Sequence, residues 1–124
     1  MSQDFISPDL RAFLLRHLDS IGQLEALLLL HRERHRAWDA GEVARRLYTS
    51  ETDAAGILAH LAAEGLIVAG EDGFRYCPMT HDQADMVEKL AVAYARHLIP
   101  VTNIIHAKPR RVREFANAFK LKKD

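Results

Sequence analysis

The sequence predicts a mainly α-helical domain that carries one small β-hairpin. Apolar residues recur every three or four positions along most of its 124 residues, which is the spacing of an amphipathic helix. Serine, threonine or aspartate stands before most of these runs, where its side chain can cap the first turn. Residues 66–77 instead show two short β-prone stretches around a glycine-containing turn.

Two helices are expected at the N-terminus. Ser7 followed by Pro8 is a typical helix start, and this first helix should end near Asp19. Ser20 and Gln23 have the spacing of a capping box, so a second helix should begin after Ser20. The apolar stripe of the second helix makes it central to the core. It consists of Ile21, Leu24, Leu27 and Leu28.

A helix-turn-helix is expected next. Asp39 predicts the start of a helix over residues 40–48, because it lies three positions before a glutamate that can complete a capping box. Ser50 predicts the start of the following helix, and Gly65 should end that helix in a left-handed conformation. Only a few residues separate the two helices, and the predicted hairpin follows directly. This order is that of a winged helix-turn-helix core.

The C-terminal part should form a long helix. Thr80 with Gln83 opens it, and Pro100 should kink or end it by removing an internal hydrogen bond. Apolar residues at spacings of three and four form a seam along this helix. The seam predicts packing either on a second subunit, giving a homodimer, or on the first helix of the same chain. It consists of Ala84, Val87, Ala91, Tyr94 and Leu98.

The whole chain is expected to form one domain. Its parts are an N-terminal helix (1–19), the winged helix-turn-helix core (20–78), the long helix (79–107) and a basic terminal helix or tail (108–124). Residues 1–107 hold 10 Lys and Arg against 15 Asp and Glu, whereas the tail holds 7 against 2. This asymmetry predicts an anionic partner or an internal docking surface. Phe115 and Phe119 would anchor the tail to the body or to a partner.

A resemblance to known proteins covers Ser20 to Pro78. The run from Leu61 to Ile67, Leu-Ala-Ala-Glu-Gly-Leu-Ile, resembles the exit from the recognition helix into the wing in many bacterial winged-helix regulators. The segment that begins at Trp38 resembles the entry into their positioning helix. The overall pattern is similar to stand-alone regulators of the MarR or PadR kind. It implies a dimeric transcriptional regulator that places two winged heads on double-stranded DNA.

The resemblance also implies individual DNA contacts. In such proteins the recognition helix contacts bases, while the wing reaches a neighbouring groove or phosphate. By position, the implied base contacts are Thr49, Ser50, Glu51, Thr52, Ala55 and His60. The implied phosphate contacts are Arg45, Arg46 and Arg75. Further contacts from the tail would be Lys108, Arg110, Arg111 and Arg113.

The charge of the recognition helix favours a different function. From Ser50 to Glu64 the chain contains no Lys or Arg, and Glu51 and Asp53 add to its negative charge. DNA phosphates repel carboxylates, so base readout by this helix is unfavourable. The alternative function is a protein–protein interaction module, in which an acidic winged helix binds a basic partner.

Other residues offer few chemical sites. His31 and His35 have the i, i+4 spacing of a metal-binding pair, but no third ligand is close in sequence, and interaction with the helix dipole is the simpler interpretation. Cys77 is either a redox-sensitive thiol or a small apolar strand residue. We expect no metal, no cofactor and no enzyme activity, because the sequence lacks a glycine-rich phosphate loop, a nucleophile elbow and a paired acid/base cluster.

Regulation and location are predicted only in outline. Three histidines either confer pH sensitivity or lie at the surface, namely His81, His97 and His106. An effector pocket between the core and the terminal helices would be lined by Phe13, Trp38 and Tyr94. A single cysteine and the lack of a membrane-length apolar run predict a cytoplasmic protein with no membrane partner.

Overall fold

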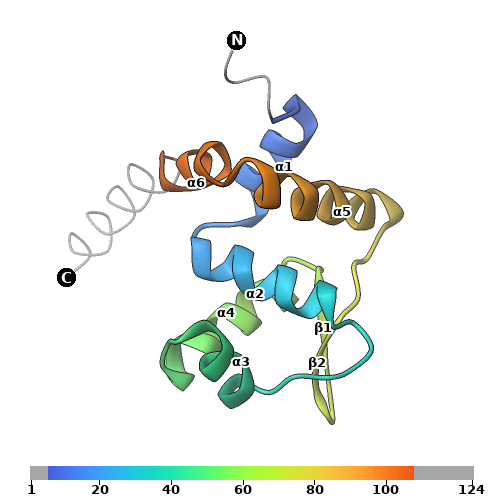
Figure 1. The fold of residues 1–124 in the computed structure, drawn as a ribbon. Helices are drawn as coiled ribbons and strands as arrows, with labels where there is room; N and C mark the ends of the chain where they lie inside the picture. The colour runs from blue at the N-terminus through green and yellow to red at the C-terminus, as the bar shows by residue number, and fades with distance from the viewer. Residues whose placement is uncertain (1–5, 108–124) are drawn as a thin grey trace, which may run out of the picture.

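The structure is a computed structural model in which residues 6–107 are described (Figure 1). Its elements are α1 (Pro8–His17), α2 (Ile21–Arg32), α3 (Ala40–Leu47), α4 (Glu51–Ala63), β1 (Ile67–Gly70), β2 (Gly73–Tyr76), α5 (His81–Arg96) and α6 (Leu98–Ala107). The predicted fold class, mainly α-helical with a small β-hairpin, is confirmed. Within residues 6–107, no helix combines the length and the apolar character needed to cross a membrane. The tail residues proposed above, from Lys108 to Phe119, lie outside the described residues.

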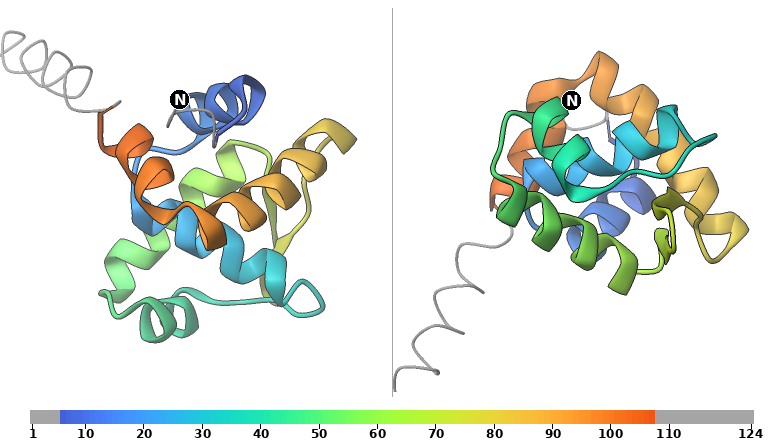
Figure 2. Two further views of the ribbon diagram at one scale, coloured as in Figure 1. Left: turned by 45° about the horizontal axis from the view of Figure 1, so that its top comes forward. Right: turned by 90° about the horizontal axis from the view of Figure 1, so that it is seen from below.

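Helix α2 lies at the centre of the molecule, between two groups of elements. Helices α1, α5 and α6 lie on one side of it, and α3, α4 and the hairpin lie on the other (Figures 1 and 2). A helix that contacts neighbours on both sides is apolar around most of its circumference. The buried α2 residues are accordingly Leu24 and Ala26 to His31.

The helices begin at the caps that the sequence predicts. Ser20 Oγ accepts a hydrogen bond of 3.1 Å from the Gln23 amide. Asp39 and Glu42 form a reciprocal capping box, with bonds of 2.8 and 3.0 Å to each other's amide groups. These bonds satisfy N–H groups that have no partner inside the helix. Thr80 forms a second capping box with Gln83, and Ser7 and Ser50 each accept a hydrogen bond from an amide of the first turn.

The hairpin is joined to the segment that leads into α3. Strands β1 and β2 pair antiparallel, with Gly70 opposite Gly73 at the turn. Trp38 and Phe74 exchange two backbone hydrogen bonds of 2.8 Å, so Trp38 acts as a third strand of one residue. Gly73 has φ +127°, and a Cβ built there would lie 2.5 Å from the Trp38 carbonyl oxygen. Glycine is therefore required for this close approach.

The predicted long C-terminal helix is interrupted earlier than expected. Helix α5 ends at Arg96, and His97 adopts φ −135° and ψ 57°, outside the helical region. Pro100 then lies in the first turn of α6, where its missing N–H leaves no internal hydrogen bond unmade. In a continuous helix the ring of Pro100 would clash with the Arg96 carbonyl, so the break falls upstream of the proline rather than at it.

Candidate functional site

The turn between α3 and α4 presents an exposed aromatic side chain. Tyr48 ends α3 with φ +58°, in the left-handed region, and its side chain is 95% exposed. The Thr49 amide donates to the Ala44 carbonyl at 3.0 Å, which holds the turn against α3. A left-handed conformation is unfavourable for a residue with a Cβ, by about 1–2 kcal/mol. The fold thus accepts a strained residue whose side chain contributes almost nothing to the core.

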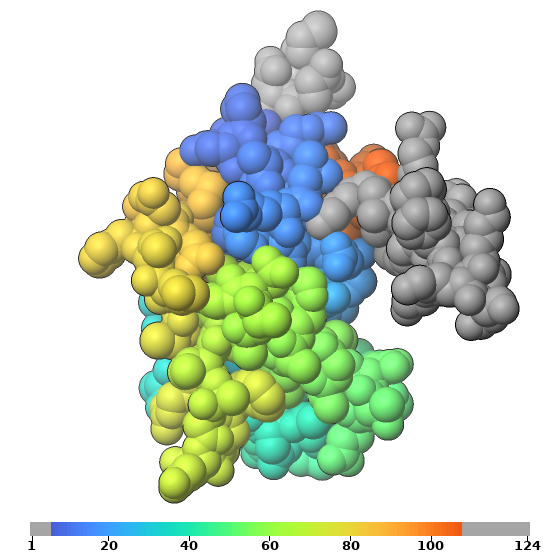
Figure 3. All heavy atoms as spheres, turned by 180° about the vertical axis from the view of Figure 1, so that it is seen from behind, coloured from blue at the N-terminus to red at the C-terminus, as the bar shows by residue number. Residues whose placement is uncertain are grey.

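We use the name α4 face for this turn together with the outward side of α4. Its residues are Tyr48, Thr49, Ser50, Glu51, Thr52, Asp53, Ala55, Gly56 and Ala59. The inward side of α4 is held in the core by Ala54, Leu58 and Leu61. Beyond the first turn, the outward side chains are small, and a Cβ added at Gly56 would meet no heavy atom within 4 Å. Figure 3 shows the outer side of α4, in green, uncovered between α1 and the hairpin.

Two predicted base contacts are already bonded within the α4 face. Ser50 Oγ accepts a hydrogen bond of 3.0 Å from the Asp53 amide. Thr49 Oγ1 donates to a carboxylate oxygen of Asp53 at 3.3 Å. Thr52 and Ala55 are exposed, as base contact would require. Among the three predicted base contacts that carry a hydroxyl group, Thr52 is therefore the one whose hydroxyl makes no hydrogen bond to another residue within 6–107.

His60 does not lie on the α4 face. Its Nε2 donates to the His17 carbonyl at 2.7 Å, and His17 Nδ1 lies 2.6 Å from a carboxylate oxygen of Glu64. These bonds join the end of α4 to the end of α1, because helix α4 turns the His60 side chain away from solvent. His60 was predicted as a base contact, whereas in the structure its imidazole joins α4 to α1.

Arg46 is also occupied within the molecule. Its Nη2 pairs with Glu33 at 2.8 Å, and its guanidinium lies 5.1 Å from the centre of the Trp38 ring. Arg36 pairs with Glu42 at 2.7 Å and stacks on the same ring at 3.9 Å. The Arg46 hydrogen bond is the main reason that the pKa of Glu33 lies below its usual value. Arg46 was predicted as a phosphate contact, but the structure uses it to cover Trp38.

The other two predicted phosphate contacts differ from Arg46 in having no ion-pair partner among the described residues. Arg45 and Arg75 are exposed, and no ion pair involves either side chain within residues 6–107. Arg75 makes one long hydrogen bond of 3.4 Å to the His35 carbonyl. A Cβ built on Gly41 would lie 3.8 Å from Arg45 Nη1 and 3.9 Å from the Glu51 carboxyl carbon. The Glu51 carboxylate therefore lies close enough to offset part of the Arg45 charge.

Carboxylates outnumber these arginines around the α4 face. Glu51 and Asp53 lie in the first turn of α4, where negative charge interacts favourably with the helix dipole. Glu71 and Asp72 are exposed at the tip of the hairpin. Figure 3 shows this tip, in yellow-green, on the same side of the molecule as α4. Both elements that would approach DNA thus carry carboxylates at their leading ends.

The histidine pair on α2 does not form a metal site. His31 is buried, with Nε2 3.0 Å from a Glu88 oxygen and 2.9 Å from Arg34 Nη2, whereas His35 is exposed beyond the end of the helix. No group of three or more metal-binding side chains occurs within residues 6–107. The hydrogen bond to His31 is the main cause that lowers the pKa of Glu88. His31 therefore joins α2 to α5. The other candidate for site chemistry, Cys77, is exposed after the hairpin.

The three residues proposed for an effector pocket do not meet. Trp38 is fully buried against the hairpin. Phe13 lines a groove between α1 and α5. Tyr94 lines a separate cavity of about 280 Å³ and donates to a Glu25 oxygen at 3.0 Å. Burial, followed by this hydrogen bond, raises the pKa of Tyr94 to about 12.

The predicted seam on α5 faces the core of its own chain. Val87 is fully buried, and Ala84, Ala91 and Tyr94 are partly buried. Leu98 is half exposed because it lies after the break at His97. The seam therefore packs within the subunit, which is the alternative that the sequence left open. The exposed apolar residues of this region are instead Val92, Leu98 and Ile99.

Comparisons with family models, curated proteins and solved structures found no match. The likeness to regulators of the MarR or PadR kind therefore rests on the residue patterns alone. Sequence reasoning located the caps and the α4 face, but it missed the exposed Tyr48 and the pairing of Arg46 with Glu33. The glutamate at 33 and the tryptophan at 38, which flank a cluster of arginines, are the signal that could have indicated this pairing.

Proposed function

We propose that the chain is a winged-helix protein-interaction module whose α4 face binds a partner protein with a basic surface. One observation carries the proposal: four exposed carboxylates lie on this face or at the hairpin tip beside it, against two arginines without an ion pair within residues 6–107, Arg45 and Arg75, while the exposed Arg46 is paired with Glu33. The carboxylates are Glu51, Asp53, Glu71 and Asp72. Complementary charge speeds encounter with a basic partner and disfavours nucleic acid.

The shape of the α4 face also suits a protein partner. Gly56 lies in the middle of an exposed helix, where glycine is less stable than alanine by about 0.5–1 kcal/mol and nothing in the described chain needs the space. With Ala55 and Ala59 beside it, a partner backbone can approach α4 closely. Tyr48 stands at the edge of this surface and supplies an aromatic anchor of the kind enriched at binding hot spots.

The experiment is site-specific photo-cross-linking in living cells of the source organism. A photoreactive side chain replaces Ala55 on the α4 face, or Ala95 on the exposed side of α5 as the matched control. We expect one protein with a basic surface to be captured from position 55 and not from position 95. The double variant Glu51→Lys/Asp53→Lys should lose this capture, because like charges then face each other.

DNA binding as a transcriptional regulator is the second candidate function. The exposed side chains of Arg45 on α3 and Arg75 on β2, neither of which forms an ion pair within residues 6–107, favour it. It predicts an affinity for duplex DNA that falls steeply with salt, and a weaker salt dependence in Arg45→Ala/Arg75→Ala. Salt-dependent, sequence-selective DNA binding by the wild-type chain, together with no protein captured from position 55, would overturn the interaction proposal.

We place this function in the cytoplasm. Cys77 is exposed and the chain has no second cysteine with which to form an internal disulfide, which suits a reducing compartment. Fractionation of cells that carry a tagged chain would check the location.

A further inference from the structure

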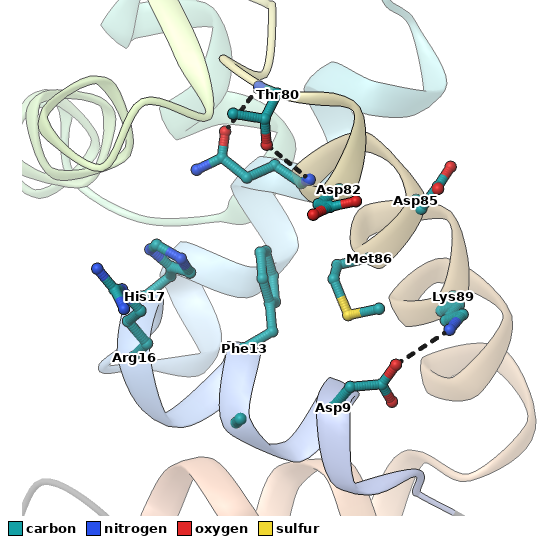
Figure 4. A pocket seen from close by; sticks show the side chains of 11 residues that line it. Asp9, Phe13, Arg16, His17, Thr80, Asp82, Asp85, Met86 and Lys89 are labelled. Carbon is teal, nitrogen blue, oxygen red and sulfur yellow. Dashed lines mark hydrogen bonds and ion pairs between the residues drawn. The ribbon is translucent and has the colours of Figure 1, made fainter.

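A groove of about 860 Å³ lies between α1 and the first half of α5 (Figure 4). Phe13 from α1 and Met86 from α5 lie beside each other in it and give it an apolar floor. At the end nearest the start of α5 stand the exposed carboxylates of Asp82 and Asp85. No ion pair within residues 6–107 involves either carboxylate. The groove thus combines an apolar floor with unpaired negative charge.

The opposite end of the groove is held by an ion pair. Lys89 Nζ from α5 lies 3.3 Å from Asp9 Oδ2 from α1, and both side chains are more than half exposed. Figure 4 shows this pair beside Met86, with Asp82 and Asp85 nearer the start of α5. Because Asp9 pairs with Lys89, the remaining charged lining residues are Asp82 and Asp85 on α5 and Arg16 on α1, so the net charge offered to a ligand is negative and lies along α5.

We propose that this groove binds residues 108–124 of a second copy of the chain. This segment holds seven Lys and Arg against two Asp and Glu, opposite to the charge of Asp82 and Asp85. Phe115 and Phe119 are four residues apart, so in a helical segment they lie on one side, where they can pack on Met86 and on the small exposed part of the buried Phe13. Aromatic rings make favourable contacts with both aromatic and methionine side chains.

The geometry favours a second copy over the same chain. The acidic end of the groove lies at the start of α5, whereas residue 107 ends α6, at the opposite end of the α5–α6 pair (Figure 1). Helix α5 has 16 residues, which span about 24 Å at 1.5 Å per residue. If the segment is helical, as the placing of Phe115 and Phe119 on one side assumes, it spans only about 12 Å from residue 108 to Phe115. Docking between copies is free of this restriction, and it can be reciprocal in a symmetric dimer.

The α4 face is a poorer site for the same segment. It carries carboxylates, but beyond its first turn the outward side chains are Ala55, Gly56 and Ala59, which give a phenylalanine little surface to contact. The groove offers Phe13 and Met86 instead. This inference is therefore independent of the proposed function, which uses the α4 face.

The test is a charge exchange in the full-length chain, measured by sedimentation equilibrium. The groove variant is Asp82→Lys/Asp85→Lys, and the tail variant is Arg110→Glu/Arg111→Glu/Arg113→Glu. We expect the wild-type chain to dimerise and each variant alone to dimerise at least about tenfold more weakly, because like charges then face each other. An equal mixture should form mixed dimers of near wild-type strength. In the mixed dimer, the intact tail enters the intact groove, and lysines face glutamates at the other site.

The matched control is Glu71→Lys/Asp72→Lys, which makes the same charge change at the hairpin tip and should leave dimerisation unchanged. The changed residues of the groove variant are exposed, and circular dichroism will verify its helix content. Monomeric wild-type chain overturns the proposal, and this includes the outcome in which the tail docks on its own subunit. Unchanged dimerisation of the groove variant also overturns it, and would indicate contact through Val92, Leu98 and Ile99 instead.

Discussion

At Tyr48 the fold keeps a residue that local energetics disfavour. Its backbone is left-handed, at φ +58°, and its ring is 95% exposed, so the core gains almost nothing from it. Glycine or asparagine would fit this conformation with less strain. Strain that the fold itself does not require commonly marks a functional position. This reading agrees with the anchoring role proposed for Tyr48 on the α4 face.

Tyr48→Asn should therefore leave stability unchanged or raise it by up to about 1 kcal/mol, because asparagine tolerates the left-handed region. The same variant should lose the cross-link formed from position 55. Urea unfolding measures the first effect, and the photo-cross-linking assay measures the second. A loss of stability above about 1 kcal/mol would instead show that the tyrosine supports the turn.

Because of Glu42, the free energy of unfolding should decrease as the pH falls through the acid range. Its hydrogen bond from the Asp39 amide, and then its pairing with Arg36, hold its pKa below the usual 4.5. A carboxyl group with a lowered pKa in the folded state stabilises the fold above the unfolded pKa, and this contribution disappears as the pH falls through the folded value.

Glu42→Gln retains an oxygen that can accept from the Asp39 amide but loses the negative charge. We expect a lower urea midpoint than wild type near neutral pH, and a smaller difference at about pH 2, because protonation removes the Glu42 charge as the pH falls through its folded-state pKa. A difference of the same size at the acid end would point to the hydrogen bond rather than the charge. Unfolding curves of both proteins at the two pH values provide the measurement.

At the level of elements, local signals predicted most of the fold. Ser7, Ser20, Asp39, Ser50 and Thr80 each begin a helix, because a cap depends only on residues within one turn. Contacts between elements were not predictable in this way. The Arg46–Glu33 pair joins α3 to the end of α2, and the groove needs α1 and α5, which are far apart in sequence, to lie side by side.

Two glycines differ in the space around them. Gly56 on α4 has no neighbouring atom near its Cβ position, whereas Gly73 in β2 lies against the backbone of Trp38. Gly56→Ala should stabilise the protein by about 0.5–1 kcal/mol, because alanine favours the helix and a Cβ meets nothing there. If the α4 face binds a backbone closely, the same change should weaken partner capture. Thermal unfolding and cross-linking yield from position 55 give the two readouts.

Gly73→Ala should have the opposite effect. A Cβ would lie 2.5 Å from the Trp38 carbonyl oxygen, and the obstructing atom belongs to the backbone, so a side-chain rotation cannot relieve the clash. We expect a loss of at least about 2 kcal/mol and disruption of the Trp38–Phe74 pairing. Urea unfolding measures the loss, and an unchanged midpoint would contradict the close approach seen in the structure.

For the whole molecule, α1 connects the two sides of the fold. It packs on α5 and α6, while His17 reaches α4 through Glu64 and His60. Leu14 is fully buried within this arrangement, in the same core cluster as residues of α2, α4 and α5. The described residues should accordingly unfold together rather than as separate terminal and winged parts.

Leu14→Ala should destabilise the whole chain by about 2–5 kcal/mol through the cavity it leaves. The neighbouring change Leu15→Ala, at a residue 39% exposed, is the matched control and should cost less than about 1 kcal/mol. Near- and far-ultraviolet circular dichroism should report one coincident transition for both variants. Two separate transitions would indicate that α1 and the C-terminal helices form a unit of their own.

The position of Trp38 gives the molecule an internal optical probe. It is the only tryptophan in the chain, and it is 1% exposed. The guanidinium groups of Arg36 and Arg46 lie 3.9 and 5.1 Å from the centre of its ring. Any ligand that draws Arg46 away from the ring, or that separates the hairpin from α3, changes the surroundings of a single fluorophore. The emission of the unlabelled protein can therefore report in real time whether binding at the α4 face reaches the core.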